Sequence, residues 1–154
     1  MPLTDLVTPE AVIPALKASS KKQALQELAD KAATLSGLPA REIFDSLVQR
    51  ERLGSTGVGG GVAMPHGKLP KCQKIFGVFA RLDKPIDFES ADEAPVDLIF
   101  LLIAPESAGA DHLSALSRAA RALRDASIVA SLRSTRDASA LYSILTRAST
   151  PNAA

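Results

Sequence analysis

The sequence contains little cysteine and few aromatic residues. It has one cysteine, Cys72, no tryptophan, and only 4% aromatic residues in 154. A single cysteine cannot form an intramolecular disulfide or supply a thiolate cage for structural zinc, so we expect a reducing compartment. The core must then be aliphatic, and the 46% of hydrophobic residues is enough for one compact domain.

The sequence also lacks an excess of either charge and any long apolar run. Lysine and arginine number 18 and acidic residues 17, so the net charge is +1 and no overall field attracts nucleic acid or a membrane surface. No apolar stretch approaches the roughly 20 residues that span a bilayer. The first residues, Met1–Asp5, show neither the basic start nor the apolar core of a signal peptide. We therefore expect a cytoplasmic protein that neither binds nucleic acid nor inserts into a membrane.

Two helices are predicted in the first third of the chain. Residues 20–23 resemble a capping box, apolar residues follow at helical spacing, and Gly37 predicts the end of this helix. Pro39 is predicted in the first turn of a second helix, which runs to Arg52.

Helical periodicity returns in the last third of the chain. Asp111 is predicted as the N-cap of a third helix, and further helical segments are predicted at 128–132 and 137–147. The third helix is predicted to bury an apolar stripe and to expose its arginines to solvent. The buried set is Leu113, Leu116, Ala120 and Leu123, and the exposed set is Arg118, Arg121 and Arg124.

The predicted strands lie between these helices. Residues 12–17 indicate a short edge strand, because Pro14 cannot donate a ladder hydrogen bond. Strands are also predicted at 62–64, 75–80 and 96–103, and the last is apolar at nearly every position, as in a central strand covered on both faces. Helices and strands thus interleave, which favours an α/β fold with three layers and a mixed sheet between helices. We expect one domain over residues 1–150 and a frayed tail at 151–154.

The segment 54–68 reads GSTGVGGGVAMPHGK and ends near His66. A glycine-dense loop can expose backbone N–H groups to an anion. The spacing matches neither a P-loop nor the dinucleotide-binding glycine pattern, which disfavours a nucleotide site. We therefore predict that the loop binds one small anion beside the imidazole. The predicted phosphate-binding residues are Gly54, Ser55, Thr56, Gly57, Gly59, Gly61 and Lys68.

Histidine suits reversible phosphoryl transfer, because a neutral ring nitrogen is a nucleophile near pH 7 and the N–P bond is labile. The transferring group needs oriented N–H groups and a cation, which Arg50 can supply from the apolar stripe of the second helix. His112 follows the predicted N-cap, where free N–H groups favour an anion, and its loop could meet His66 at one edge of the sheet. This chemistry requires no metal and no cofactor.

Each of these features also has a structural interpretation. Arg50 alone fits a solvated helix end, and His112 fits a hydrogen bond within a helix start. The glycines fit a flexible connection, although three in a row make a costly linker unless backbone must approach closely.

Residues 50–68, together with 20–22, 95–98 and 112–113, resemble the fructose/mannitol-type enzyme IIA family of the bacterial phosphotransferase system. Within that family the likeness is greatest to the nitrogen-regulatory branch, and it extends over almost the whole chain. The resemblance implies a mixed sheet flanked by helices. It also implies that His66 is phosphorylated, that Arg50 belongs to the active site, and that His112 is an auxiliary histidine.

The resemblance further implies the partners. The donor is expected to be an HPr-like phosphohistidine protein, charged by an enzyme I that uses phosphoenolpyruvate. Regulatory targets, including potassium-transport components, would respond to the phosphorylation state. Two alternatives stay open, a sugar-specific IIA subunit that passes phosphate to a IIB cysteine and a module that senses phosphate without covalent change. A metallohydrolase is disfavoured, since two histidines without a carboxylate cluster make a poor metal site.

Overall fold

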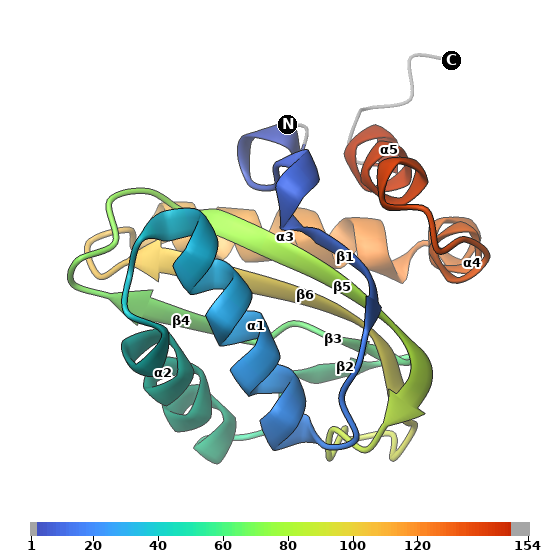
Figure 1. The fold of residues 1–154 in the computed structure, drawn as a ribbon, viewed down its shortest axis with the longest axis horizontal. Helices are drawn as coiled ribbons and strands as arrows, with labels where there is room; N and C mark the ends of the chain where they lie inside the picture. The colour runs from blue at the N-terminus through green and yellow to red at the C-terminus, as the bar shows by residue number, and fades with distance from the viewer. Residues whose placement is uncertain (1–2, 149–154) are drawn as a thin grey trace.

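A computed structural model describes residues 3–148, whose strands form one mixed six-stranded sheet (Figure 1). The order is β1-β5-β6-β3-β2, and β4 also pairs with β6. Strand β6 is parallel to β3 and β4 and antiparallel to β5, so it is the centre of the sheet. The strands are β1 (Val12–Leu16), β2 (Gly57–Gly59), β3 (Val62–Ala63), β4 (His66–Leu69), β5 (Phe76–Ile86) and β6 (Val96–Pro105).

Helices cover both faces of this sheet, which confirms the predicted three-layer α/β fold. One face carries α1 (Lys21–Ser36) and α2 (Ala40–Arg52), and α3 (Ala110–Arg124) lies on the other (Figure 1). After α3, α4 (Ala126–Arg133) and α5 (Ala138–Ala148) bring the chain back beside β1. Two short 3-10 turns, Leu3–Asp5 and Pro9–Ala11, precede β1.

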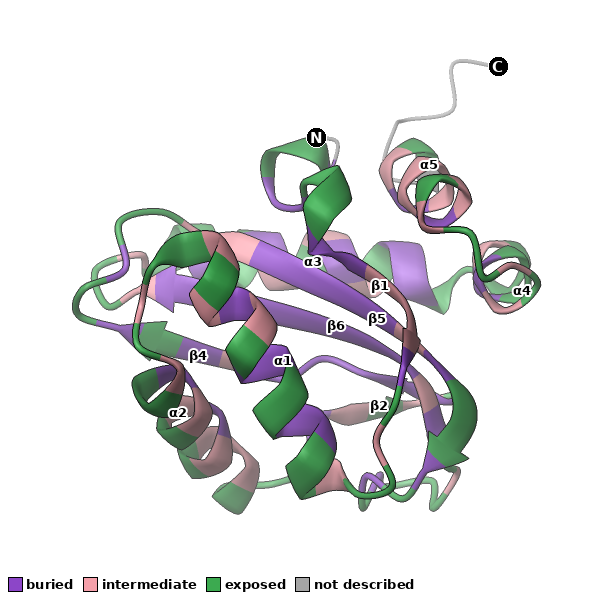
Figure 2. Ribbon diagram, in the orientation of Figure 1, coloured by how far each residue is buried: buried purple, intermediate pink, exposed green. Residues whose placement is uncertain are grey.

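The core lies along β5 and β6. Strand β6 is buried at Val96 and at every position from 98 to 104, as its apolar sequence predicts (Figure 2). The aromatic rings of Phe79 and Phe100 are fully buried there, opposite each other across the β5–β6 ladder. Burial of apolar surface on both faces therefore orders the central strand, against which β4 with His66 pairs.

The first helix begins and ends as predicted. Ser20 Oγ accepts from the N–H of Gln23 at 3.1 Å, and Gly37 adopts the left-handed conformation with φ 79°. The capping box is only half formed, because the Gln23 side chain accepts from the N–H of Ser19 instead of that of Ser20. Strand β1 lies at the edge of the sheet, which confirms the prediction from Pro14.

Two helix starts were predicted one or two positions away from where they occur. Pro39 is the N-cap of α2 and precedes the first helical residue, Ala40. Gly109 is the N-cap of α3, so Asp111 lies within the first turn and does not cap it. Its φ of 47° is a conformation that favours glycine, and this explains the earlier start.

The predicted buried face of α3 was wrong at Leu113, whereas Leu116, Ala120 and Leu123 do pack on the core. Leu113 is 69% exposed, Leu116 and Ala120 are half-buried, and only Leu123 is buried. Small side chains allow α3 to lie close to the sheet, so its buried residues are His112, Ala115, Ala119, Ala122 and Leu123. On the opposite side Arg121 and Arg124 are exposed, whereas Arg118 binds Asp5 at 3.0 Å.

The structure does not test the two predictions about the limits of the domain and its tail. The tail at 151–154 lies outside the described residues, and the domain limits 1–150 stay a prediction. Within residues 3–148, no helix is both long enough and apolar enough to cross a bilayer.

Candidate functional site

His66 is the first residue of β4 and pairs with Leu102 on the central strand. Its Nδ1 lies 3.0 Å from the carbonyl oxygen of Met64, and its Nε2 lies 3.2 Å from Arg50 Nε. A carbonyl can only accept a hydrogen bond and a guanidinium can only donate one. The proton of the neutral ring therefore belongs on Nδ1, and Nε2 keeps the lone pair that a nucleophile needs.

The surroundings of His66 keep the ring neutral. Burial lowers the pKa of His66 below its ordinary value of 6.5, the Met64 carbonyl acts in the opposite sense, and the positive charge of Arg50 lowers the pKa further. The side chain is only half-buried, so the ring is not turned into the hydrocarbon interior. A neutral, accessible imidazole is the form that can attack phosphorus near pH 7.

Close packing of α2 on β4 places Arg50 beside this ring. A Cβ on Gly67 would lie 2.2 Å from Ser46 Oγ, so only glycine lets the helix approach this closely. Arg50 lies one helical turn after Ser46, and its Nη1 donates to the carbonyl of Gly54 at 2.9 Å. The guanidinium is thus held between the end of α2 and the imidazole.

His112 reaches the same place from α3. The two imidazole centroids are 5.5 Å apart, with an angle of 70° between the ring planes. His112 is 5% exposed, and its Nε2 has no hydrogen-bond partner among residues 3–148. Burial, followed by the neighbouring His66 and Lys68, lowers the pKa of His112 below 6.5. The structure therefore brings together the two histidines that were predicted to converge, and it leaves one buried ring nitrogen beside His66 able to bind a ligand atom.

Lys68 adds a positive charge on the same side of β4. Side chains alternate along a strand, so Lys68 and His66 point to one face while Gly67 points to α2. Lys68 is exposed, and its charge contributes to the lowered pKa of both imidazoles. The site thus combines two neutral rings with two cations, which suits an anionic ligand.

Most of the glycine loop folds into a hairpin. Strands β2 and β3 pair antiparallel. Gly59, at the end of β2, and Gly60 and Gly61, in the turn that follows, all have positive φ. Gly60 N–H donates to Asp92 at 3.0 Å, and Gly61 O accepts from the N–H of Asp97 at 3.0 Å. These backbone groups already have partners within the fold.

The hairpin lies away from the imidazole along the sheet. Val62 pairs with Leu98 and His66 pairs with Leu102, a separation of four strand residues or roughly 13 Å. Gly57, Gly59 and Gly61 belong to the hairpin, and the structure does not bring them together with His66. Of the predicted loop residues, Gly54 contacts Arg50 directly.

Ser55 and Thr56 bind protein groups. Ser55 Oγ donates to the carbonyl of Phe88 at 2.7 Å. Both the N–H and the hydroxyl of Thr56 donate to the carboxylate of Glu51. Sequence reasoning missed Glu51, although its position next to Arg50 was a usable signal, and it missed the carbonyl of Met64.

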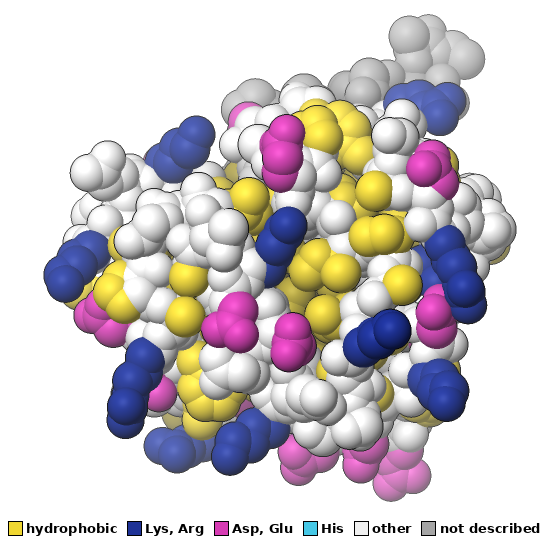
Figure 3. All heavy atoms as spheres, viewed as in Figure 1, with side chains coloured by type: hydrophobic (Ala, Val, Ile, Leu, Met, Phe, Trp, Pro, Cys, Tyr) yellow, Lys and Arg dark blue, Asp and Glu magenta, His cyan; other side chains and the backbone are white. Residues whose placement is uncertain are grey.

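Two exposed leucines flank the site. Leu53 follows Arg50 by three residues and is 85% exposed, and Leu113 follows His112 and is 69% exposed. Neither histidine is visible on the face of the molecule shown in Figure 3.

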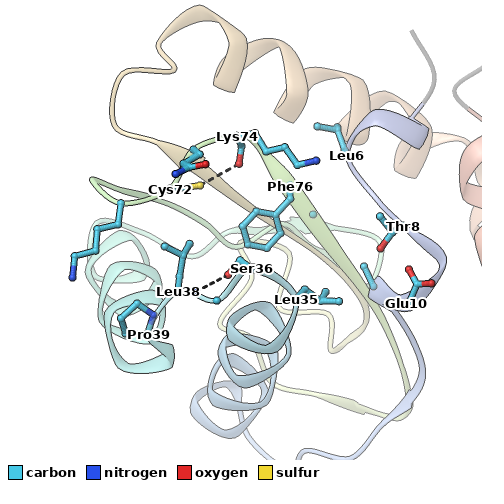
Figure 4. A pocket seen from close by; sticks show the side chains of 15 residues that line it. Leu6, Thr8, Glu10, Leu35, Ser36, Leu38, Pro39, Cys72, Lys74 and Phe76 are labelled. Atoms are coloured by element: carbon cyan, nitrogen blue, oxygen red, sulfur yellow. Dashed lines mark hydrogen bonds between the residues drawn. The ribbon is translucent and has the colours of Figure 1, made fainter.

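A groove of about 1010 Å³ lies elsewhere, between the N-terminal turns, the end of α1 and the start of β5 (Figure 4). Phe76, Leu35 and Leu38 line it together with Lys74 and Cys72, and none of the predicted site residues does. Burial raises the pKa of the Cys72 thiol, which donates to the carbonyl of Lys74. Within the described part of the chain, no cluster of three or more histidine, cysteine or acidic residues could hold a metal ion.

Comparison with known proteins gives consistent results. The family described as "Phosphoenolpyruvate-dependent sugar phosphotransferase system, EIIA 2" matches residues 5–148. A nitrogen regulatory protein of Bradyrhizobium diazoefficiens is 68% identical over 145 residues, covering 94% of this chain and 95% of the relative. A fructose-specific EIIA component of Haloferax volcanii is 36% identical over 106 residues, covering 68% of this chain and 69% of the relative.

Solved structures show the same fold. The nitrogen regulatory protein IIA-Ntr of Neisseria meningitidis is 35% identical, with a TM-score of 0.89 over 94% of this chain and 99% of the other. The mannitol IIA of Escherichia coli has a TM-score of 0.76 at 21% identity, over 90% of this chain and 97% of the other, and supports the fold alone.

Proposed function

The chain belongs to the EIIA 2 family of the phosphoenolpyruvate-dependent sugar phosphotransferase system and acts as a phosphocarrier, and from this premise we propose that His66 carries the phosphoryl group. The observation that supports this most directly is the hydrogen bonding of the ring. With Nδ1 on the Met64 carbonyl and Nε2 toward Arg50, the lone pair is on Nε2.

The proposed transfer is an in-line displacement between two histidines. The Nε2 lone pair of His66 forms a bond to phosphorus while the N–P bond of the donor phosphohistidine breaks, and its electron pair returns to the donor ring. The proton on Nδ1 stays in place, and the Met64 carbonyl stabilises the positive charge that develops on the ring. Arg50 Nε must leave the lone pair during this step, and the same guanidinium then binds a phosphoryl oxygen.

Other site residues stabilise the negative charge on the remaining oxygens of the transferring phosphoryl group. Lys68 supplies a second cation, and the unpartnered Nε2 of His112 can bind a phosphoryl oxygen when that nitrogen carries a proton. Such preorganised donors stabilise charge that spreads over the oxygens in the transition state, so this proposal needs no metal and no nucleotide.

We propose that the donor is an HPr-like phosphohistidine protein in the cytoplasm, and that the phosphorylation state regulates other proteins, potassium-transport components among them. The name of the relative at 68% identity supports a nitrogen-regulatory role over sugar uptake. The likeness to a fructose-specific component keeps transfer to a IIB cysteine as the second candidate. Added IIB protein distinguishes the two, because only a sugar-specific subunit would rapidly lose its phosphate to the IIB cysteine.

The proposal is tested with purified enzyme I, an HPr-like protein and phosphoenolpyruvate. The wild-type chain is expected to gain one acid-labile phosphate, and His66→Ala is expected to gain none. His112→Ala keeps the nucleophile and is expected to be labelled more slowly. Equal labelling of His66→Ala would show that another residue accepts the group.

A further inference from the structure

Glu51 has a carboxylate that is buried and fully engaged, one position after Arg50. Its side chain is 6% exposed, and its Oε1 lies 2.8 Å from Lys21 Nζ and accepts from Thr56 N–H at 3.1 Å. Its Oε2 accepts from the Thr56 hydroxyl. Three segments, the start of α1, the end of α2 and the base of the glycine hairpin, therefore meet at this one carboxylate.

Two routes lead from Glu51 to the two nitrogens of His66. The first is the main chain to Arg50, whose Nε donates to His66 Nε2 at 3.2 Å. The second passes through Thr56, whose carbonyl accepts from Met64 N–H at 2.9 Å, while the Met64 carbonyl binds His66 Nδ1 at 3.0 Å. Both hydrogen-bond partners of the imidazole are therefore anchored to the same side chain.

The position of Lys21 indicates that its ion pair with Glu51 fixes the relative placement of α1 and α2. Lys21 is the first residue of α1, where a positive charge is unfavourable for the helix dipole. Its Nζ instead lies 2.8 Å from Glu51 and 5.0 Å from the centroid of the Phe88 ring. A buried ion pair loses hydration on folding and is weak evidence for stability, but it does impose one relative placement on the segments it joins.

We propose that Lys21, Glu51 and Thr56 form a positioning clamp that sets the orientation and tautomer of the His66 ring and the approach of Arg50. None of the three contacts the ring, so each acts through Arg50 or Met64. The purpose of the clamp rests on the proposed function of His66, whereas its geometry can be measured without any phosphoryl transfer.

The test compares Glu51→Gln and Thr56→Val with a matched control on the same helix. Glu51→Gln keeps the shape but loses the charge, and Thr56→Val keeps the main-chain bonds but loses the hydroxyl. Glu42→Gln makes the same change at an exposed pair with Lys71, 4.0 Å apart, and serves as the control. Thr56→Ser restores the hydroxyl and is the rescue variant.

Two readouts separate positioning from general stability. The first is the nitrogen-15 chemical shifts of the His66 ring as a function of pH, which report its tautomer and its pKa. The second is the single-turnover rate of phosphorylation by the HPr-like donor. We expect Glu51→Gln to loosen the ring, so that its nitrogen shifts no longer report a single tautomer with the proton on Nδ1, and to slow transfer about tenfold. The loss of the Glu51 charge also lowers the pKa of His66 directly, so the pKa alone does not decide the clamp. Thr56→Val is expected to slow transfer less and Thr56→Ser to restore the wild-type rate, while Glu42→Gln changes neither readout.

The outcomes that would overturn the clamp differ from those that would overturn the proposed function. Wild-type ring shifts and a wild-type rate in Glu51→Gln would exclude the clamp and leave His66 as the acceptor. If the wild-type chain were not labelled at His66, the proposed function would fail, and the ring shifts would still decide the clamp. If Glu51→Gln does not fold, Thr56→Val and its rescue by Thr56→Ser decide it.

Discussion

An arginine lies near each end of β6, but the two arginines differ in what their charge meets. At the Val96 end, Arg133 Nε binds Asp97 Oδ2 at 2.8 Å, and its Nη2 binds the carbonyl of Gly60. At the other end, Arg50 donates to a neutral imidazole and a carbonyl and has no ion pair among residues 3–148. One arginine is neutralised and structural, and the other keeps a charge available for an anion.

This difference separates two roles that lie close together in the sequence. The glycines and His66 are a few residues apart, yet the backbone groups of Gly60 and Gly61 are bound by Asp92, Asp97 and Arg133. The end with His66 and His112 contains an unpartnered ring nitrogen and uncompensated positive charge. An unpartnered nitrogen and free charge next to a nucleophile therefore indicate the reactive end of the sheet, which glycine content alone does not.

The largest expected effect is at the Arg50 end. Arg50→Ala removes one donor to the transferring group, which typically costs about 3 kcal/mol of transition-state stabilisation, so transfer should slow about 100-fold. The free energy of unfolding should change by less than about 1 kcal/mol, because the core is untouched. The measurements are single-turnover phosphorylation and denaturant unfolding. Arg41→Ala, at the exposed start of the same helix, is the control, and equal rates in the two variants would contradict the role of Arg50.

The opposite pattern is expected at the Arg133 end. Gly61 has φ 82°, and a Cβ there would lie 2.3 Å from Arg133 Nη2, so Gly61→Ala should lower the free energy of unfolding by about 2 kcal/mol. Gly60→Ala has a similar φ of 66° with nothing within 4 Å, so it should cost only about 1 kcal/mol. Folded Gly61→Ala should be phosphorylated at the wild-type rate. A rate loss as large as that of Arg50→Ala would make the hairpin part of the site.

The smallest expected effect is in the pH dependence of stability. The pKa values of His66 and His112 are lowered from 6.5 in the folded chain. Between the lowered pKa values and pH 6.5, the unfolded chain therefore binds more protons than the folded chain. The free energy of unfolding should rise as the pH increases through this range, and it should fall as the pH decreases. Urea unfolding from pH 5 to 7 measures the slope. His66→Ala should make it shallower, whereas Arg133→Gln should lower stability without changing the slope, and an unchanged slope in His66→Ala would contradict the assignment.

Sequence patterns predicted helices and strands correctly where the local residue pattern matches the burial that the fold imposes. The apolar run of β6 and the Ser20 and Gly37 caps of α1 each follow from neighbouring residues, and all three were predicted. The position of Leu113 on α3 was predicted wrongly, because the face that packs most closely on the sheet is made of small residues, Ala115, Ala119 and Ala122. His66 was predicted as the reactive histidine from the glycines before it, and the family resemblance implied the roles of Arg50 and His112.

What the sequence determined by itself was the helices, four of the six strands and the identity of the histidine, because periodicity, capping and residue type act over a few neighbouring positions. Only the tertiary structure decided which groups meet. Asp97 and Arg133 close the glycine hairpin from positions far along the chain, and Lys21 reaches Glu51 across 30 residues. Such contacts depend on how the sheet and helices pack in three dimensions, and no local pattern contains that information.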